Sequence, residues 1–477
     1  MTATPQATDS DLPAGYTYFG QFIDHDVTFD AIEFAKDIDP GGMSEDELTQ
    51  RRSPSLDLDS LYGNEWPKVR SDLFESDGLT FRLGPTTSIP EGIPGGPLES
   101  FPGFDVPRDQ GGKAIIGDPR NDENLIVQQL HLAFLKFHNR VASVLRQSAP
   151  SEPADIVLLR TRELVTLHYQ WLVIEDFVRR VVLPETFTSV LGVPSLLGAT
   201  TVAPKLLIFP VVGSETPPMP LEFSAAAYRF GHTIVRERYG WNRIFPNSGF
   251  DLFFRFTELS GDVGSPGLET FPSNWIADWR RMFPLEDAGV PINRAVVALN
   301  RARSFDPHLA PVLGNLPKSG SGTDKVNLAV RNLIRGSRVR LPSGQDIAKA
   351  IVLAGDPTAA PMTPEQILSG LPAGMQKALT DHELHIKSPL WFYILREAQV
   401  KGASQRLGPV GSRIVLETFV GLVRASVTSI FSSSTAAPGQ LTVFSPHTSR
   451  MVTPNGAPIT SMSHLLASVG DINPLGD

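Results

Sequence analysis

The chain has 477 residues, of which 41% are apolar and 19% charged, as in an ordinary globular protein with a large buried core. Its net charge of −9 comes from 42 basic and 51 acidic residues spread along the sequence, which offers no basic surface for a nucleic acid. There is no cysteine, and this excludes disulfides, iron–sulfur clusters and cysteine nucleophiles.

The N-terminal segment, residues 1–12, is mostly small, polar or acidic, and we expect it to form a flexible tail. It lacks the charged start and the apolar core of a signal peptide. No stretch of the sequence reaches the roughly 18 consecutive apolar residues of a membrane-spanning helix. We therefore expect a soluble protein with one domain over residues 13–477. The sequence does not decide between a cytoplasmic location and secretion by a route that needs no leader.

Helical periodicity dominates the rest of the sequence. Residues 82–118 are rich in glycine and proline, which predicts a long loop over the core. Residues 124–147 and 164–182 follow, each with apolar residues at helical spacing and neither glycine nor proline. Further helices are predicted over residues 223–239, 326–333, 364–368 and 413–431. Alternating strand patterns are scarce, so we predict a mainly α fold with long irregular connections and little β structure.

The segment GQFIDHD, residues 20–26, places His25 between Asp24 and Asp26. An isolated triplet of this kind is more often a solvated turn than a functional site. Its meaning depends on whether distant segments supply side chains with complementary chemistry.

Three later segments contain such side chains: DPRNDE with Arg120 and Glu123, YRFGH with Arg229 and His232, and NLIRGSRVRLP with Asn332 and Arg335. In this order, and together with GQFIDHD, they resemble the motifs of the animal-type haem peroxidases, the peroxidase-cyclooxygenase superfamily. The resemblance spans nearly the whole chain, and the compact sequence without cysteine resembles bacterial members. It implies a single large helical haem-peroxidase domain.

The resemblance assigns four residues to one face of haem b. His232 would be the axial ligand of the iron, and Asn332 would accept the proton on its other ring nitrogen, which fixes the tautomer and makes the ligand more basic. Arg229 and Arg335 would pair with the haem propionates, because carboxylates match the guanidinium fork.

On the opposite face, the resemblance assigns the reaction with hydrogen peroxide to His25, Arg120 and Gln21. An imidazole with an ordinary pKa of about 6.5 can take one proton from the peroxide and return it to the departing oxygen. A nearby guanidinium stabilises the negative charge that accumulates on that oxygen. A ferryl intermediate would then oxidise a small donor such as a phenol, bromide, iodide or thiocyanate.

Asp24 and Glu123 occupy the two positions at which family members form ester bonds to haem methyl groups, so two covalent esters are expected. Some members add a third link from a methionine directly after this glutamate, where the present sequence has Asn124. Without that electron-withdrawing link, we expect donors that are easier to oxidise than chloride.

The segment SPSLDLDSLYG, residues 53–63, resembles the calcium loop of the family, in which alternate residues offer oxygen atoms to a hard cation. The resemblance assigns Ca²⁺ ligands to Ser53, Ser55, Asp57, Asp59 and Asp26. An ordinary solvated turn is the alternative for the loop. Because Asp26 adjoins His25, we expect the removal of calcium to lower activity.

Two histidines, His131 and His138, lie seven residues apart on one predicted helix. This spacing would allow a metal pair, but core histidines with satisfied hydrogen bonds are the preferred interpretation.

Two other functions stay open. A fatty-acid dioxygenase of the same superfamily uses a tyrosine three residues before the proximal histidine. Here that position is Arg229, and Tyr228, one residue away, would be turned by about 100° on a helix. A non-catalytic, calcium-stabilised binding protein would have no use for His25, Arg120 and His232 together. The peroxidase is therefore the predicted function.

Overall fold

The computed structural model describes residues 8–29, 52, 55–63, 70–209, 219–257, 262–264, 268–315, 327–433 and 439–476. Ser53, one of the expected calcium ligands, and residues 1–7 of the expected tail lie outside these ranges. Residues 9–12, the other part of that tail, belong to strand β1 (Asp9–Pro13). This strand pairs antiparallel with β5 (Arg301–Arg303), with Asp9 opposite Arg303 and Pro13 opposite Arg301.

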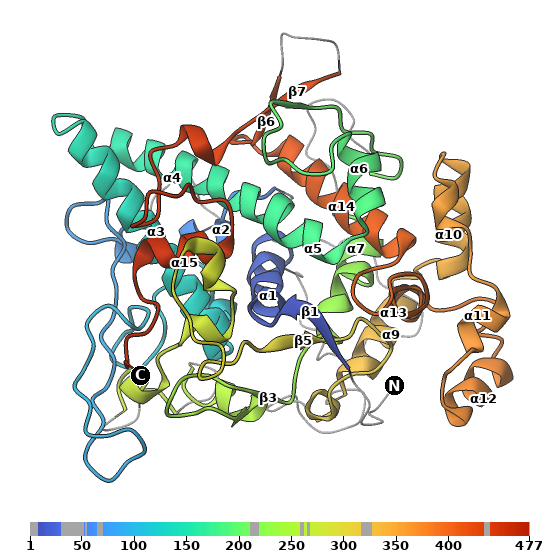
Figure 1. The fold of residues 1–477 in the computed structure, drawn as a ribbon, viewed down its shortest axis with the longest axis horizontal. Coiled ribbons are helices and arrows are strands. Elements are labelled where there is room, and N and C mark those ends of the chain that lie inside the picture. Colours follow the sequence, from blue (N-terminus) through green and yellow to red (C-terminus); the bar gives the residue numbers. More distant parts are fainter. Residues whose placement is uncertain are drawn as a thin grey trace.

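The fold is mainly helical, as predicted from the sequence (Figure 1). The N-terminal half contains α1 (Gly15–Val27), α2 (Asp59–Tyr62), α3 (Leu125–Ser148), α4 (Ala154–Trp171), α5 (Arg179–Val181), α6 (Pro184–Leu191) and α7 (Leu221–Ser224). The C-terminal half contains α9 (Leu328–Arg338), α10 (Gly344–Leu353), α11 (Pro364–Leu368), α12 (Ala373–Asp381), α13 (Leu390–Lys401), α14 (Pro409–Ala425) and α15 (Met462–Val469). No helix in these described ranges is long and apolar enough to cross a bilayer.

The β structure among the described residues is limited to short pieces. Strand β7 (Leu441–Val443) lies between β2 (Thr201–Val202) and β6 (Phe431–Ser433), and both pairs are antiparallel. Strand β3 (Arg238–Tyr239) pairs with β4 (Ser248–Gly249). The long segment between residues 82 and 118 contains only isolated bridges, in agreement with the predicted loop.

Helix α1 lies in the middle of the molecule and packs against α3 and the end of α4 (Figure 1). Its core face carries Phe19 and Phe22, which are fully buried. The Phe22 ring stacks on Phe134 of α3 with centroids 4.8 Å apart and meets Tyr169 of α4 edge-on at 6.2 Å. Burial of aromatic rings of this size is a main source of fold stability, and here it fixes the rotation of α1 about its axis.

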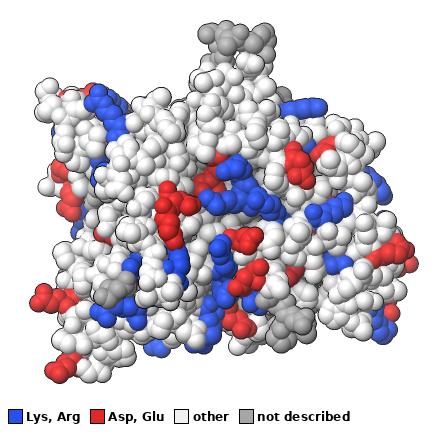
Figure 2. Space-filling model, viewed as in Figure 1, with Lys and Arg blue, Asp and Glu red and all other residues white. Residues whose placement is uncertain are grey.

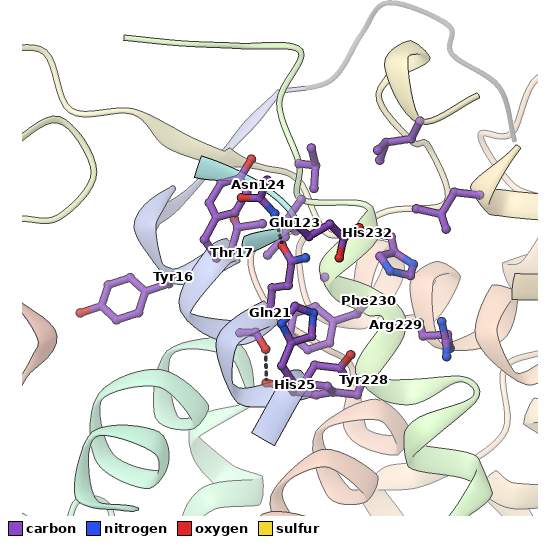
Figure 3. Close-up of a pocket in the computed structure, with 18 of the residues that line it drawn as sticks. Tyr16, Thr17, Gln21, His25, Glu123, Asn124, Tyr228, Arg229, Phe230 and His232 are labelled. Atoms are coloured by element: carbon purple, nitrogen blue, oxygen red, sulfur yellow. Dashed lines mark hydrogen bonds between the residues drawn. The ribbon is translucent and has the colours of Figure 1, made fainter. Parts of the chain in front are cut away.

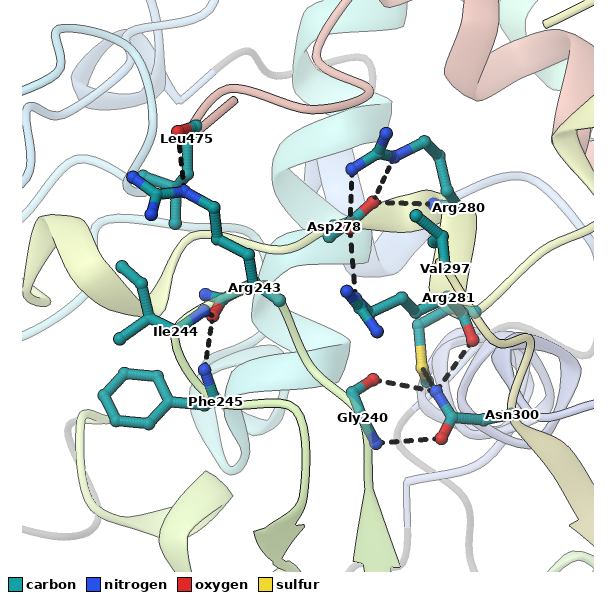
Figure 4. A network of polar contacts seen from close by, with 12 residues as sticks. Gly240, Arg243, Ile244, Phe245, Asp278, Arg280, Arg281, Val297, Asn300 and Leu475 are labelled. Atoms are coloured by element: carbon teal, nitrogen blue, oxygen red, sulfur yellow. Dashed lines mark hydrogen bonds and ion pairs between the residues drawn. The ribbon is translucent and has the colours of Figure 1, made fainter. Parts of the chain in front are cut away.

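The N-terminus of α1 is held by a polar network around Asn300 (Figure 4). The Asn300 carbonyl accepts a hydrogen bond of 2.9 Å from the backbone N–H of Ala14. Its side-chain amide exchanges hydrogen bonds of 2.9 and 2.8 Å with the backbone of Gly240. Nearby, the buried Asp278 carboxylate binds Arg280 at 2.8 Å and Arg281 at 3.1 Å. The start of α1 is therefore tied to the segments next to β3 and β5.

The predicted helices at residues 124–147 and 164–182 are confirmed, with one modification. After Trp171 the hydrogen bonding widens to a π-helical turn over Leu172–Val178, which then continues into α5. This turn directs both Glu175 and Asp176 inward, where Asp176 accepts a hydrogen bond of 2.9 Å from Tyr16 and Glu175 accepts one of 2.6 Å from Ser195. A π-turn of this kind often accompanies a functional site.

The predicted helix over residues 223–239 is wrong. Helix α7 ends at Ser224, and a 3₁₀ turn over Ala227–His232 and strand β3 follow. Three alanines follow Ser224, so helix propensity does not explain the end of α7, but Gly231 and the β-branched residues Thr233, Ile234 and Val235 disfavour an α-helix farther along the segment. The helix predicted over residues 413–431 likewise ends at Ala425, before Ser426, Val427 and Thr428.

Positive and negative side chains are interspersed on the face shown in Figure 2, where a group of basic residues near the centre is bordered by acidic ones. Several arginines of the structure are in ion pairs, among them Arg179 with Glu175 at 2.8 Å and Arg180 with Asp176 at 2.9 Å.

Candidate active site

A cavity of about 300 Å³ lies between α1 and the 3₁₀ turn Ala227–His232 (Figure 3). This volume is at the lower end of the range of about 300–1,000 Å³ that is usual for ligand and cofactor sites. Six residues predicted from the sequence line the cavity: Gln21, Asp24, His25, Glu123, Arg229 and His232. The structure thus brings together three segments that are more than 200 residues apart at their extremes.

Helix α1 supplies Gln21, Asp24 and His25 to the cavity because side chains three and four residues apart share one face of an α-helix. The opposite face of the same helix carries the buried rings of Phe19 and Phe22. Apolar anchoring on one side therefore orients the polar triad on the other.

His25 is buried, and its Nδ1 lies 2.8 Å from Oδ1 of Asn121. Burial lowers the pKa of His25, as does the positive charge of Arg120, although nearby carboxylates oppose this shift. A lowered pKa keeps the imidazole neutral at pH 7, the form that can accept a proton. With Nδ1 bonded to Asn121, the nitrogen left for the cavity is Nε2.

His232, in the 3₁₀ turn, has the features of a neutral axial ligand. Its Nδ1 lies 2.9 Å from Nδ2 of Asn332 in α9, the residue expected beside it from the sequence. An amide NH₂ group can only donate, so in this orientation the ring hydrogen of His232 lies on Nε2, whereas the sequence predicted that Asn332 accepts the hydrogen of the other ring nitrogen. Nε2 can bind a metal ion only with the Asn332 amide turned by 180°, so that Oδ1 accepts from Nδ1. Burial, with the charges of Arg229 and Arg331, lowers its pKa to about 3. A metal ligand must be deprotonated, and this environment favours that form.

Arg120 does not line the cavity, contrary to the expectation from the sequence. Its Nη2 donates to the backbone carbonyl of His25 at 2.7 Å and to Oδ2 of Asp118 at 2.7 Å, and its guanidinium lies 4.4 Å from the centre of the Phe29 ring. Asp118 also binds Arg52. The guanidinium therefore lies behind His25, because a buried carboxylate two residues earlier attracts it.

Arg229 and Arg335 were expected beside the haem propionates, and the cavity is lined by Arg229 but by Arg331 in place of Arg335. Arg335 is buried in α9, whereas Arg331, one turn earlier on the same helix, is exposed. The sequence contained a signal for this, since Arg331 adjoins Asn332.

Asp24 and Glu123 both line the cavity and are half-buried, so two carboxylates are available at its wall. One oxygen of Asp24 accepts a hydrogen bond of 3.0 Å from Thr28. Asn124, next to Glu123, is also in the lining and donates from Nδ2 to Oε1 of Gln21 at 3.2 Å. The sequence indicated only that Asn124 stands where some family members have a methionine, and it did not predict this contact with Gln21.

Tyr228 also lines the cavity, which corrects the expectation that it is turned away. That expectation assumed an α-helix, whereas the residues form a 3₁₀ turn along the cavity wall. The hydroxyl of Tyr228 donates to the backbone carbonyl of Gly20 at 3.0 Å, and its ring stacks on Phe223 at 4.7 Å. Burial raises the pKa of this phenol.

The predicted calcium loop lies beside Asp26, which is fully buried and accepts hydrogen bonds from the backbone N–H groups of Ser60 at 3.0 Å and Leu58 at 3.3 Å. Burial, followed by the charges of Asp57 and Asp59, raises the pKa of Asp26 to about 7. This electrostatic strain between acidic groups is what a bound cation would relieve.

The geometry of the loop does not complete a metal site. Ser55 donates to Asp57 at 2.7 Å, and a guanidinium nitrogen of Arg162 lies 4.0 Å from Asp59. In the part of the chain that the structure describes, no three histidine or acidic side chains converge as metal ligands do. The charge of this region fits a cation, and one of the expected donors, Ser53, lies outside the described residues, so calcium ligation stays a prediction.

His138 has the expected role of a core histidine, since its two ring nitrogens lie 2.9 Å from the Tyr62 hydroxyl and 2.9 Å from the Leu79 carbonyl. His131 differs from this expectation. Its Nδ1 lies 2.9 Å from Nδ2 of Asn121, and its Nε2 has no hydrogen-bond partner among the described residues.

The chain is similar to known proteins in part of its sequence and in its fold. Residues 32–248 match the profile of the animal haem peroxidase family. The matched region includes Arg120, Glu123 and His232, whereas His25 and Asn332 lie outside it. The match covers slightly less than half of the 477 residues.

Curated relatives resemble parts of the chain. Human thyroid peroxidase is 27% identical over 192 residues, which are 38% of this chain and 19% of that protein. A peroxidase-like protein of Margaritifera margaritifera is 29% identical over 228 residues, or 47% of this chain and 26% of that protein. The similarity therefore spans well under two thirds of these relatives.

Solved structures extend the likeness of the fold to nearly the whole chain. Peroxidase A of Dictyostelium discoideum superposes with a TM-score of 0.56 at 16% identity, covering 90% of this chain and 82% of that one. The fatty acid alpha-dioxygenase of Oryza sativa superposes with a TM-score of 0.57 at 11% identity, covering 89% and 71%. At such identities the likeness shows the shared fold.

Proposed function

We propose that the protein is a haem peroxidase that reduces hydrogen peroxide and oxidises small donors such as phenols, bromide, iodide or thiocyanate. One observation carries the proposal. His25 and His232 line one cavity, and each has its Nδ1 bonded to an asparagine, so that each presents Nε2. We also propose that the protein is related to the bacterial members of the superfamily.

The residues around the cavity fit haem b. His232 would bind the iron through Nε2 with the Asn332 amide turned so that its oxygen accepts the hydrogen of Nδ1, and burial keeps the ring neutral. Arg229 and Arg331 would bind the propionates. Asp24 and Glu123 would be the ester-forming carboxylates.

Haem bound there would supply the iron at which the peroxide bond is broken and the oxidising equivalents for the donor. His25 accepts one peroxide proton at Nε2 and holds it for the departing oxygen. Arg120 acts on His25 from behind, through its hydrogen bond to the His25 carbonyl and its charge, and stabilises the neutral ring. Gln21 and Asn124 supply the amide groups of the same wall.

A fatty-acid dioxygenase is the second candidate, supported by the plant dioxygenase fold and by Tyr228 in the cavity lining. Arg229 at the third position before His232, and the bond of the Tyr228 hydroxyl to Gly20, favour the peroxidase.

The experiment that separates the candidates is a pair of assays on the haem-loaded full chain. We expect hydrogen peroxide to be consumed with a phenolic donor, and no oxygen uptake with a long-chain fatty acid. Oxygen uptake without peroxide turnover would favour the dioxygenase. If the chain is fully loaded with haem and catalyses neither reaction, both candidate functions are refuted. A chain that binds no haem would favour a binding protein.

A further inference from the structure

We propose that Asn121 and Asn124 are positioning residues that set the polarity of the α1 wall of the cavity. Asn121 would hold His25 so that its unprotonated Nε2 faces the cavity. Asn124 would hold Gln21 so that its NH₂ group faces the cavity. The meaning of this wall for peroxide rests on the proposed function, whereas the orientation of the two side chains does not.

The orientation of Asn124 follows from its backbone partner. Its Oδ1 accepts a hydrogen bond of 3.1 Å from the N–H of Val127, at the N-terminus of α3, and a backbone N–H can only donate. The Nδ2 group is thereby directed to Oε1 of Gln21, 3.2 Å away. Because Gln21 uses its oxygen in this bond, its NH₂ group is left for the cavity that it lines (Figure 3).

Asn121 is fully buried between two imidazoles. Its Oδ1 lies 2.8 Å from Nδ1 of His25, and its Nδ2 lies 2.9 Å from Nδ1 of His131. In this arrangement His25 carries its hydrogen on Nδ1, and His131 accepts at Nδ1 and carries its hydrogen on Nε2. A rotation of this one amide by 180° would reverse both tautomers.

The Gln21 donors favour the first arrangement. Gln21 and His25 are one turn apart on α1 and line the same cavity, so the reversed amide would place a His25 N–H on the same wall as the Gln21 N–H groups. With the Asn121 amide in its present orientation, the wall instead presents one acceptor, Nε2 of His25, beside two donors, the N–H groups of Gln21. His131 does not decide the matter, because its Nε2 lacks a hydrogen-bond partner among the described residues in either case.

This polarity selects the chemical class of the first ligand. A neutral hydroperoxide donates its O–H to the bare nitrogen of His25 and accepts from Gln21 through its oxygen lone pairs. A halide anion has no hydrogen to donate, and it would face the lone pair of His25. We therefore expect the resting wall to favour the neutral hydroperoxide over an anion.

The test reads the tautomers directly in the full chain with ¹⁵N-labelled histidine, by NMR, with any bound haem in its diamagnetic ferrous carbonyl state. The signals of His25 and His131 are assigned with the variants His25→Gln and His131→Gln. In the unmodified chain we expect hydrogen on Nδ1 of His25 and on Nε2 of His131.

Substitutions of Asn121 should affect His25 and His131 differently. Asn121→Asp keeps the acceptor for His25 but cannot donate to His131, so Nδ1 of His25 stays protonated and His131 gains a hydrogen on Nδ1. Asn121→Leu removes both bonds, and both rings lose their fixed tautomer. Asn139→Leu is the matched control, because Asn139, on α3 like His131, bonds through its amide to the backbone N–H and carbonyl of Phe81 instead of to either ring.

A His25 ring with its hydrogen on Nε2 in the unmodified chain would overturn the proposal, as would an Asn121→Asp variant in which His131 is unchanged. These readings need neither haem nor activity, so they can fail or succeed independently of the peroxidase.

Asn124 is tested through the carbon monoxide stretching frequency of the ferrous haem complex. Asn124→Asp keeps the helix cap but cannot donate to Gln21, which would turn its oxygen toward the cavity. Loss of the Gln21 donors should raise the frequency, and the same substitution at the other asparagine cap, Asn327, should not. An unchanged frequency in Asn124→Asp would contradict the role of Asn124.

Discussion

His25 and His232 line the same cavity, and their substitutions should fail in different ways. His25→Ala removes the proton acceptor, so peroxide turnover should fall by about 10²- to 10⁴-fold while haem content stays the same. His232→Ala removes the axial ligand, so haem content itself should fall. Haem content by absorption and single-turnover peroxide kinetics measure the two effects, with the exposed His447 replaced by alanine as a control. Wild-type kinetics in His25→Ala would contradict its role.

The buried pair of Asp118 and Arg120 should make stability depend on pH. Burial alone would raise the pKa of Asp118, but the hydrogen bonds and charge of Arg120, with His25 and Arg52, bring it below its ordinary value. The stabilisation is therefore complete above the unfolded pKa of about 3.9 and is lost as the pH falls toward the folded value.

Asp118→Asn tests this dependence. At pH 7 it should lower the free energy of unfolding by about 3–5 kcal/mol, because it leaves two arginines without their carboxylate. The difference from the unmodified chain should shrink as the pH is lowered below 4, as measured by denaturant unfolding. A difference that is the same at pH 7 and pH 3 would contradict the pairing.

The sequence motifs indicated that His25 and His232 would line one cavity and that Asn332 would lie beside His232, but Arg120 and Arg335, which the motifs also specified, do not line the cavity. The motifs did not predict Asn121, Arg331 or the position of Arg120. The roles of Asn121 and Arg331 depend on neighbours that are distant in sequence. The position of Arg120 depends on the attraction of its guanidinium to a carboxylate. The spacing of residues in a motif predicts neither.

Among the elements, the long helices α3 and α4 were predicted because their apolar periodicity extends over many turns. The turn Ala227–His232 was predicted as part of an α-helix, because a run of six residues is too short for its apolar periodicity to distinguish a 3₁₀ turn from an α-helix. This difference in local structure brought Tyr228 into the cavity lining.

The segment Ser55–Gly63 and helix α1 should respond together to calcium. A cation would offset the repulsion that raises the pKa of Asp26, so added Ca²⁺ should raise the melting temperature, and exhaustive chelation should lower both it and peroxide turnover. The double variant Asp57→Asn, Asp59→Asn should lose the response. Glu91→Gln, which removes one exposed charge elsewhere, should keep it. An unchanged rate after proven metal loss would contradict the calcium prediction.

The whole molecule combines a fold shared by peroxidases and dioxygenases with a cavity built from segments across the chain. The sequence predicted the mainly helical class, because fold class depends on periodicity summed over hundreds of residues. The strand pairing of residues 9–13 with Arg301–Arg303 was not predicted, since a five-residue strand has too little pattern to identify its partner.

The most direct test of the central claim is the absorption spectrum of the purified full chain, expressed with haem available, followed by extraction with acidified organic solvent. We predict a Soret band whose chromophore stays with the protein through Asp24 or Glu123. A band that extracts freely would keep the peroxidase and remove the ester bonds. The absence of any Soret band would contradict the assignment of His232 as a haem ligand, and with it the proposed function.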